Sequence, residues 1–541
     1  YRFPRGEDLS YYRDNFEVYD ESRNLNIQNW HTSYEDFEQN PYWITNRIQT
    51  KEVRMHAIVS LSANLQVNDW LTVQARGNVD CIDDKVRQKF YASTAPALAG
   101  ANGRYLEMDY QDLQFYGDLM LMVKKKWGDF SVNGALGGSI TDKTTNSTRY
   151  DSKTASLYYA NVFTLANIIM NGSAALDQKI DSHRQLQSLF ATAQVGYKES
   201  AYIDLTARND WSSTLPIDKN SFFYPGATLS WIFTKLIPEN KVLSFGKIRL
   251  AYGKTGNDAA PYQTGVTYIQ GTANGYYGAD IAKFPMNGSN AFQASNTKGS
   301  SSLKPEMTSE FETGFNLQFF NGRIGIDATY YNRTTNDQIF TLPVDPSTGY
   351  SFMVTNFGKV RNSGIELVLN TVPVHTRNFR WDLDFNFAKN KNKVISLPES
   401  LEGGKVSIYS FSAGNDAIYM YAEEGKPMGQ FYTYLPKYTE DGKPIVDAKG
   451  QPILSTTVED TGKNMNNDWS GGVNTAFTYK DFTLSAALDI RKGGYMFSRT
   501  KNLMQFTGNG VVTTYNGRRP FIIPNSVVEN SDGTYSENTT P

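Results

Sequence analysis

Two alternating segments joined by Asn321-Gly322 constrain the fold of this chain more than any other feature. In the arms 310–320 and 323–331, apolar and polar side chains take turns along the sequence. Alternation with a period of two predicts a β-strand with one apolar and one polar face, and Asn-Gly predicts a tight hairpin turn. Each arm is about ten residues long with aromatic residues near its ends, which is typical of a membrane-spanning strand. The apolar face of the first arm carries Phe311, Thr313, Phe315, Leu317 and Phe319.

The composition excludes some classes of protein and leaves a membrane barrel open. The 541 residues hold 53 Lys and Arg against 55 Asp and Glu, so no excess of positive charge points to nucleic acid. Mean hydropathy is −0.49, and no stretch approaches the roughly 18 apolar residues of a spanning helix. A barrel hides its apolar band in alternate residues, so its mean hydropathy stays low. The single Cys81 excludes an internal disulfide framework.

The hairpin pattern recurs along the chain and predicts roughly fourteen strands. The connections within a strand pair mostly take two or three residues, whereas those between pairs are long. Short turns on one side and long loops on the other favour an outer-membrane barrel over a soluble sandwich. The other predicted hairpins span 56–80, 114–140, 186–208, 222–253, 362–389 and 473–490, and the long connections span 81–113, 141–185, 254–309, 332–361 and 390–472.

The predicted fold class is therefore all-β: a transmembrane, antiparallel, up-and-down barrel with long extracellular loops. Residues 51–490 supply the strands and loops, and 1–50 and 491–541 are expected to be loop-like. The whole range 1–541 is interpreted as part of one barrel domain. Because the chain begins at Tyr1 without a Met or an apolar leader, it is interpreted as an internal piece of a longer protein.

No residues indicate an enzyme, a cofactor or a metal site. Four histidines are scattered without ligand spacing, three of them in predicted loops or turns, and Cys81 has no His nearby. Asp382 and Asp384 share one face of a strand, and a hydrated lumen wall explains them better than acid–base catalysis. The stretch 446–452 lacks the alternating oxygen ligands of a calcium site. The histidines are His31, His56, His183 and His375.

Tyrosines in the long loops are the candidates for ligand contact. Tyr276, Tyr277 and Tyr409 are proposed as binding residues, because aromatic rings stack on sugars and grip peptides. The alternative for each is that the ring packs one loop against another. Tyrosine pairs also occur at 158–159 and at 419 and 421. Tryptophan favours the headgroup level of a membrane, which predicts girdle positions for Trp70, Trp127, Trp381 and Trp469 and an extracellular strand end for Trp211.

An ordered set of motifs resembles the SusC/RagA-type TonB-dependent outer-membrane transporters of Bacteroidetes. The motifs are LTARNDWSSTLP at 205–216, KIRLAYGKTGND at 247–258, LKPE at 303–306, IGIDATYYN at 324–332, GKVRNSGIEL at 358–367 and FAKNKN at 387–392. The resemblance implies a 22-stranded barrel with a plug, a SusD-like surface lipoprotein as partner, and TonB as the source of energy. The chain departs from this pattern because it offers no plug, no TonB-contacting segment and too few strands.

The resemblance implies active import of nutrient oligomers across the outer membrane, with glycans or their oligosaccharides first and peptides as the alternative. The Asn321-Gly322 turn is then expected to point into the periplasm. Three other classes stay open: a passive porin or adhesin barrel, a soluble β-rich carbohydrate-binding module, and an enzyme of a surface glycan system. In isolation, fourteen strands would leave two unpaired edges, which do not persist in hydrocarbon.

Overall fold

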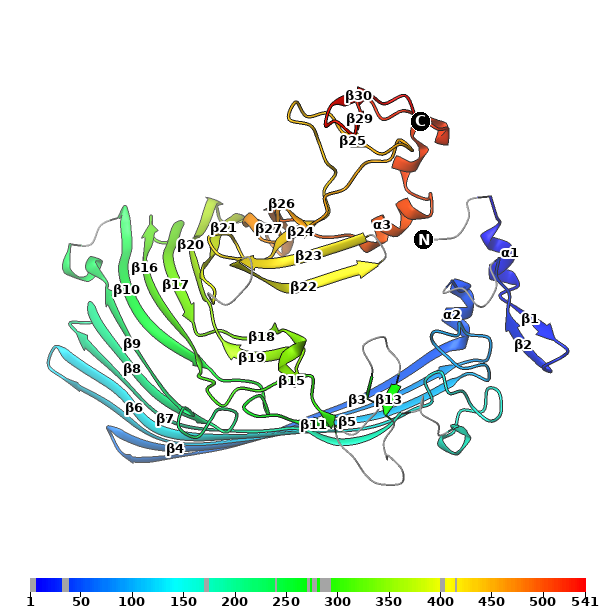
Figure 1. Cartoon of the computed structure of the whole chain (residues 1–541). Helices are drawn as coiled ribbons and strands as arrows, with labels where there is room; N and C mark the ends of the chain where they lie inside the picture. The colour runs from blue at the N-terminus through cyan, green and yellow to red at the C-terminus, as the bar shows by residue number, and fades with distance from the viewer. Residues whose placement is uncertain are drawn as a thin grey trace.

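One curved sheet of fourteen strands dominates the computed structural model (Figure 1). The structure describes residues 6–31, 38–169, 175–238, 241–269, 273–274, 280–282, 293–398, 404–413 and 416–541. The strand order in the sheet is β28-β27-β21-β20-β17-β16-β10-β9-β8-β7-β6-β5-β4-β3, and every neighbouring pair is antiparallel. Apart from the strands inserted in long connections, sequence neighbours are sheet neighbours. The predicted up-and-down, all-β fold and its fourteen strands are confirmed.

The strands of the main sheet fall into a long and a short group. Five consecutive strands have 20 to 24 residues each: β3 (Ile48–Asn68), β4 (Leu71–Phe90), β5 (Arg104–Trp127), β6 (Phe130–Asp151) and β7 (Ala175–Tyr197). The others have 11 to 18 residues: β8 (Ala201–Ser212), β9 (Ser221–Trp231), β10 (Leu243–Asn257), β16 (Glu306–Phe319), β17 (Ile324–Asn336), β20 (Lys359–His375), β21 (Phe379–Ser396), β27 (Asn467–Tyr479) and β28 (Phe482–Gly493).

The long strands correct two predicted loops. β4 and β5 continue through most of 81–113, and β6 and β7 through about half of 141–185. On β4 the outward positions are apolar from Val73 to Cys81 and then become charged, beginning at Asp83. Nine residues span about 30 Å along a strand and, at a tilt near 40°, fill an apolar band about 25 Å tall. Beyond the apolar band both faces of the sheet are exposed to solvent. The alternation of apolar and polar residues therefore disappears although the strand continues.

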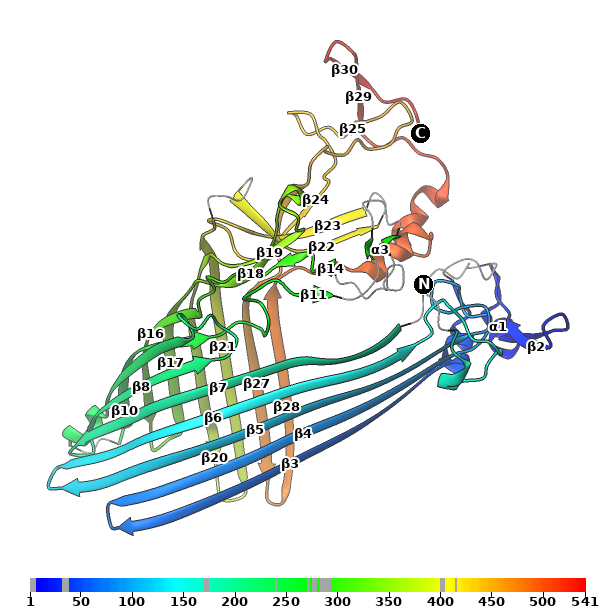
Figure 2. The same ribbon diagram turned by 60° about the horizontal axis from the view of Figure 1, so that its bottom comes forward.

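The two faces of the sheet carry different residues. Positions that alternate with the apolar ones form polar rows, which we call the lumen rows; the apolar positions form the lipid-facing rows. Phe222, Val360 and Val394 belong to lumen rows, and all three pack against loop residues. Because these loops lie on the concave side of the sheet (Figures 1 and 2), the lumen rows face inward. On β3 the lumen positions include Ser60, Ser62 and Asn64, and the lipid-facing positions include Ala57, Val59, Leu61, Ala63 and Leu65.

The hairpin at 310–331 forms, but its turn is longer than predicted. Phe319 pairs with Ile324, which leaves a loop of four residues, 320–323, instead of the two-residue Asn-Gly turn. Phe320, Asn321 and Gly322 all adopt positive φ, at 54°, 55° and 83°. The predicted two-residue turn was wrong. The alternation of apolar and polar residues does not show that the residues flanking Asn-Gly, at 320 and 323, are no longer paired between the two strands. Phe320 therefore belongs to the loop.

Aromatic side chains gather at the end of the sheet where the turns are short. Trp70 and Trp127 lie beside the first two of these turns, as predicted, and are 42% and 52% exposed. Trp381 also lies near this end, where its indole stacks on Phe477 with ring centroids 5.5 Å apart and donates through Nε1 to Thr475 Oγ1 at 2.9 Å. Trp211 and Trp469 lie toward the opposite ends of β8 and β27. Other exposed aromatic residues at the short-turn end are Phe130, Tyr197, Trp231, Phe320, Tyr479 and Phe482.

The two terminal segments contain short elements, which corrects the prediction that 1–50 and 491–541 are loop-like. The first holds α1 (Leu9–Asp14), β1 (Glu17–Asp20), β2 (Leu25–Gln28) and α2 (Pro41–Arg47); the last holds α3 (Arg499–Phe506), η5 (Val511–Arg518), β29 (Val527–Glu529) and β30 (Tyr535–Glu537). Asp8 and Asn40 cap the first two helices. Helices of six to eight residues are too short to show a periodic pattern. No helix in the described ranges is long and apolar enough to cross a membrane.

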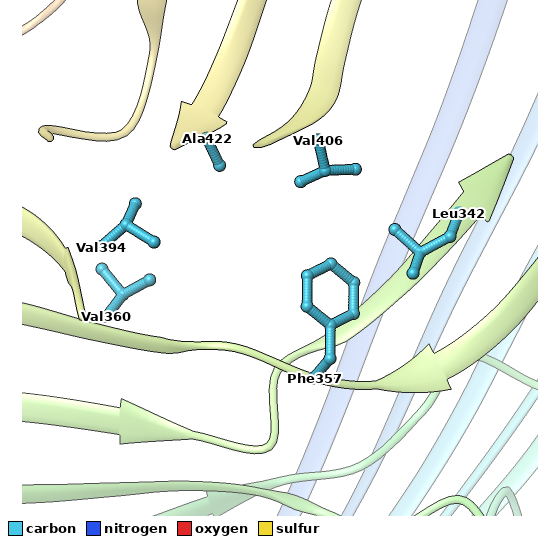
Figure 3. Close-up of a cluster of buried hydrophobic side chains, with 6 residues drawn as sticks. All are labelled: Leu342, Phe357, Val360, Val394, Val406 and Ala422. Atoms are coloured by element: carbon cyan, nitrogen blue, oxygen red, sulfur yellow. The ribbon is translucent and has the colours of Figure 1, made fainter. Parts of the chain in front are cut away.

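The long connections carry small sheets of their own. A four-stranded sheet, which we call the roof sheet, comprises β22 (Lys405–Ala413), β23 (Asp416–Glu423), β24 (Gln430–Thr433) and β26 (Glu459–Asn464). It is fixed to the wall by a buried cluster of six apolar side chains (Figure 3): Leu342, Phe357, Val360, Val394, Val406 and Ala422. The other loop strands are β11 (Tyr268–Ile269), β12 (Ala273–Asn274), β13 (Asp280–Ala282), β14 (Gln293–Ala294), β15 (Thr297–Lys298), β18 (Ile339–Pro343), β19 (Phe352–Asn356) and β25 (Ile445–Val446), with short helices η1 (Leu165–Asn167), η2 (Phe233–Leu236) and η3 (Pro346–Thr348).

Candidate functional site: the lumen wall and the roof sheet

Ion pairs between neighbouring strands line the lumen. Arg54 on β3 binds Asp84 on β4 at 2.6 Å, and Arg76 on β4 binds Asp118 on β5 at 2.9 Å. The Asp118 side chain is fully buried although Arg76 is half exposed. The carboxylates of such pairs are held by charge-assisted hydrogen bonds, which are stronger than neutral ones. The lumen wall is therefore polar, internally paired and laterally braced.

Asp210 is the centre of one such network. Arg208 donates through Nε to Asp210 Oδ1 at 2.7 Å and through a terminal nitrogen to Ser188 Oγ at 2.7 Å. The hydroxyl of Tyr224 donates to the other oxygen of Asp210. The network ties β7, β8 and β9 together, and it explains the charged residues of the motif at 205–216.

Asp258 joins two of the motifs that carry the family resemblance. Arg184 binds it through two hydrogen bonds of 2.7 and 2.9 Å, and Thr214 donates to it at 3.1 Å. Ser212 also donates to the same carboxylate, whose side chain is 5% exposed. The end of the motif at 247–258 therefore anchors the last part of the motif at 205–216, where β8 ends and the following loop begins. This connection fixes the loop at the long-connection end of β8.

A third network crosses a whole strand. Arg249 on β10 donates to Asp327 on β17 at 2.8 and 3.2 Å, although β16 lies between the two strands. The residue of β16 that pairs with Arg249 is Gly314. A Cβ at position 314 would lie 3.0 Å from Arg249 Nε and 2.7 Å from the carbonyl oxygen of Ala328. The glycine thus leaves room for the guanidinium to cross.

Most of the residues considered for catalysis form hydrogen bonds or ion pairs with other side chains of the barrel wall. Asp382 accepts from Arg380 at 2.6 to 2.9 Å, and Asp384 accepts from Asn370 at 2.9 Å. His56 lies 2.8 Å from Asp80. His183, which was predicted in a loop, lies on β7 and contacts Asp142 at 3.0 Å, and His375, predicted in a turn, ends β20. Those two loop predictions were wrong because they fell where the strands lose their alternation.

No metal site is assembled in the part of the chain that the structure describes. Among those residues, no three or more His, Cys, Asp or Glu side chains come together in a way that could hold an ion. In the stretch 446–452, Asp447 accepts hydrogen bonds from the backbone N–H groups of Lys449 and Gln451 at 2.9 and 2.8 Å. Its carboxylate therefore closes a turn.

The roof sheet carries an aromatic and charged cluster on the face opposite its apolar contacts. The rings of Tyr419 and Tyr421 stack with centroids 5.9 Å apart. The Lys405 ammonium lies 5.0 Å from the Tyr421 ring centroid and 4.5 Å from that of Tyr432. Lys426 binds Asp460 at 2.7 Å, and this contact raises the pKa of Lys426 above its ordinary value. We call these six residues and Glu423, which accepts from Tyr432, the roof cluster.

The candidate ligand residues are only partly placed. Tyr409 lies on β22 of the roof sheet and is 55% exposed. Tyr276 and Tyr277 lie outside the described residues. Lys405 and Tyr432 were missed by the sequence analysis. The i, i+2 spacing of the tyrosines at 419 and 421 was the one signal for this cluster, since it places both on one face of a strand.

A second concave feature lies lower in the lumen, toward the short turns. It is a hollow of about 630 Å³ on strands β3 to β8. A chain of side-chain hydrogen bonds crosses it, from Asn133 to Gln194 at 3.1 Å and from Gln194 to Asp204 at 2.6 Å. Lys124 and Gln66 also line the hollow. The lumen thus offers polar groups below and an aromatic surface above.

Comparison with known families and relatives extends this description. Residues 1–539 match the family model described as "TonB dependent receptor-like, beta-barrel". TonB-dependent receptor P3 of Formosa agariphila is 23% identical over 436 residues, which cover 76% of this chain and 42% of the relative. TonB-dependent receptor SusC of Bacteroides thetaiotaomicron is 30% identical over 311 residues, or 54% of this chain and 30% of the relative.

The fold is similar to that of a solved transporter. The structure of the RagAB peptide transporter superimposes with a TM-score of 0.71 at 19% identity, covering 88% of this chain and 51% of that chain. The chain therefore spans about half the length, or less, of the relatives it matches. At this level of identity the structural match shows a shared fold and nothing more.

Proposed function

The chain belongs to the TonB dependent receptor-like β-barrel family, and we propose that it forms part of the wall and the outer loops of an importer energised through TonB. Receptors of this family are outer-membrane transporters and not enzymes. In the proposed cycle, a nutrient oligomer is captured between the long loops and a SusD-like surface lipoprotein. A pull by TonB on a plug then opens a path past the lumen wall.

The proposal extends to the substrate, which we take to be a glycan or an oligosaccharide. The observation that carries this choice is the roof cluster. Two stacked tyrosines beside a lysine offer a flat apolar surface next to charged hydrogen-bonding groups, and the pyranose ring has an apolar face with polar edges. Tyr409, exposed on the same sheet, is proposed as a further contact. The ordered, internally paired wall below would present hydroxyl-binding groups without net charge.

The test uses the full-length receptor purified from outer membranes, with binding measured by isothermal titration calorimetry. The probes are a mixture of neutral oligosaccharides and a mixture of short peptides. Tyr421→Ala and Tyr409→Ala should each weaken oligosaccharide binding about fivefold, since loss of an aromatic contact costs about 1 kcal/mol. Tyr535→Ala, an exposed tyrosine on β30, is the matched control and should leave binding unchanged.

Peptide import is the second candidate, favoured by the fold shared with the RagAB peptide transporter. Binding of the peptide mixture but not of the oligosaccharides would replace the first choice of substrate. Energy coupling is tested separately by uptake in cells with and without a protonophore. Uptake that persists at the same rate without a proton gradient would contradict the importer and favour a passive porin.

A further inference from the structure

The lipid-facing row of β21 changes from apolar to basic at a single level. Phe385 and Phe387 are the last apolar residues of the row, and Lys389, Lys391 and Lys393 follow at successive outward positions. All three lysines are exposed. They therefore begin where the apolar band ends, on the side of the long connections (Figure 1).

The neighbouring strand repeats the change in register. On β20 the lipid-facing row runs upward through Leu369, Leu367 and Ile365 to Ser363 and Arg361. Ile365 pairs with Lys389, and Arg361 pairs with Lys393. Together with Lys359, one position beyond, these side chains form what we call the basic band: Lys359, Arg361, Lys389, Lys391 and Lys393.

The basic band has no carboxylate counterpart among the described residues. None of its five members takes part in an ion pair there, and the outward residues of β17 beside it, Asn332 and Thr334, are neutral. Arg361 and Lys393 face each other directly, an arrangement that destabilises an antiparallel pair. An anion bound between them would remove this repulsion.

On β4 and β5, two of the basic residues just above the apolar band do have acidic partners. On β4 and β5, Arg87 binds Glu107 at 2.9 Å and Lys85 lies 3.6 Å from Asp83. On that side Arg87 and Lys85 each have a carboxylate partner, although Lys51 of β3, which pairs with Arg87, has no ion pair among the described residues. On β20 and β21 none of the five basic residues has such a partner among the described residues.

The lysines are not needed to hold the strand. Asn390 and Asn392, which alternate with them, point to the lumen side and both donate to Asn362 Oδ1, at 3.0 and 2.9 Å. Asn392 also accepts from the backbone N–H of Met428, which fixes the segment just before β24. The asparagines thus brace the wall and its roof, while the lysines project outward with no such role.

We propose that the basic band binds the phosphate groups of the phosphorylated glycolipid in the outer leaflet of the outer membrane. Its height directly above the apolar band is the level of those phosphates. The four lysines and one arginine of the band, in two adjacent rows, could each contact a phosphate oxygen, while the apolar residues below contact the acyl chains. A lipid bound in this way would stay with the barrel during extraction.

The experiment measures binding of monophosphoryl lipid A, and of its dephosphorylated form, to the full-length receptor by native mass spectrometry in detergent. Wild-type receptor should prefer the phosphorylated lipid. The variant K389Q/K391Q/K393Q should bind it about 100-fold more weakly, since each basic residue near an anionic surface contributes about fivefold.

The control variant K51Q/K85Q/K89Q removes the same charge from the lipid-facing rows of β3 and β4 and should bind within twofold of wild type. Equal losses in both variants would show general attraction and overturn the proposal. The wild-type measurement requires no substitution, so the proposal is tested even if the triple variant fails to insert. A wild-type receptor without preference for the phosphorylated lipid would also overturn it.

Discussion

Arg249 reaches Asp327 across an intervening strand because the residue between them, on β16, is Gly314. The contact links β10, β16 and β17, in the region where the resemblance to the family is strongest. Three strands are thereby clamped through one side chain.

Replacing the glycine at this crossing should loosen the wall. In Gly314→Val, the added atoms would meet the Arg249 guanidinium and the Ala328 carbonyl oxygen, and we expect a loss of about 1–3 kcal/mol of stability. The measurement is the temperature at which the receptor loses its folded mobility on a detergent gel. Gly253→Ala is the control, because Gly253 lies on the lumen row of the neighbouring strand β10 and a Cβ there meets nothing within 4 Å.

Removing the carboxylate at position 258 should free a loop. In Asp258→Ala, Arg184 loses both of its hydrogen bonds to the carboxylate and Ser212 and Thr214 lose theirs, for a cost of about 2 kcal/mol. Limited proteolysis should then cut the loop after β8 faster than in wild type. Asp218→Ala removes an exposed carboxylate from the same loop, and equal cleavage in the two variants would contradict the anchoring role.

The N-terminal segment should detach from the wall in acid. Arg47 donates to Glu17 at 2.7 and 2.8 Å and holds the pKa of Glu17 below its ordinary value of 4.5. A lowered pKa means that the pair stabilises the segment above pH 4.5 and that the gain is lost as pH falls through the folded pKa. Hydrogen exchange of β1 and β2, corrected for intrinsic rate, should accelerate below pH 4.5.

The Glu17→Gln variant provides the comparison for this acid effect. At pH 7 the amides of β1 and β2 should exchange faster in this variant than in wild type, since their protection falls by about 1 kcal/mol. Their exchange rate should also change less when the pH is lowered. A wild-type profile that matches the variant at every pH would show that the pair does not hold the segment.

The short turns should be reachable only from the periplasm. In a Cys81→Ser background, a cysteine at Asn321 should react with a membrane-impermeant maleimide only after the outer membrane is permeabilised. A cysteine at Asp218, on a long connection, should react in intact cells. Labelling of the 321 position in intact cells would invert the assigned orientation.

The strands could be predicted from the sequence where one face contacts lipid, because apolar and polar residues alternate there. They could not be predicted beyond the apolar band, where this alternation is absent. The strands of the hairpin at 310–331 were located to within a few residues because each outward side chain must be apolar. β4 to β7 were cut short because their upper parts, beyond Cys81 and its neighbours, are wet on both faces. The caps of α1 and α2 involve single residues, Asp8 and Asn40, too local for a periodic signal.

The candidate site was less accessible to prediction for a different reason. Tyr409 and the tyrosines at 419 and 421 are visible in the sequence, but Lys405 joins the aromatic cluster only through the pairing of β22 with β23 and the approach of β24. The junction of Arg184 with Asp258 spans 74 positions. Such contacts depend on strand register, which a single sequence does not reveal.

The long strands β3 to β7 extend one side of the barrel wall far above the apolar band. From Cys81 to Phe90, β4 rises about 30 Å along its axis above the apolar band. Five such strands are joined by continuous hydrogen-bonded ladders, so a change in the tilt of one strand would be shared by its neighbours. A change in tilt of about 5° at the lipid level would move their upper ends, and the N-terminal segment fixed there through Arg47 and Trp43, by about 3 Å. A small change of tilt at the level of the lipid would thus become a larger displacement at the upper ends of these strands.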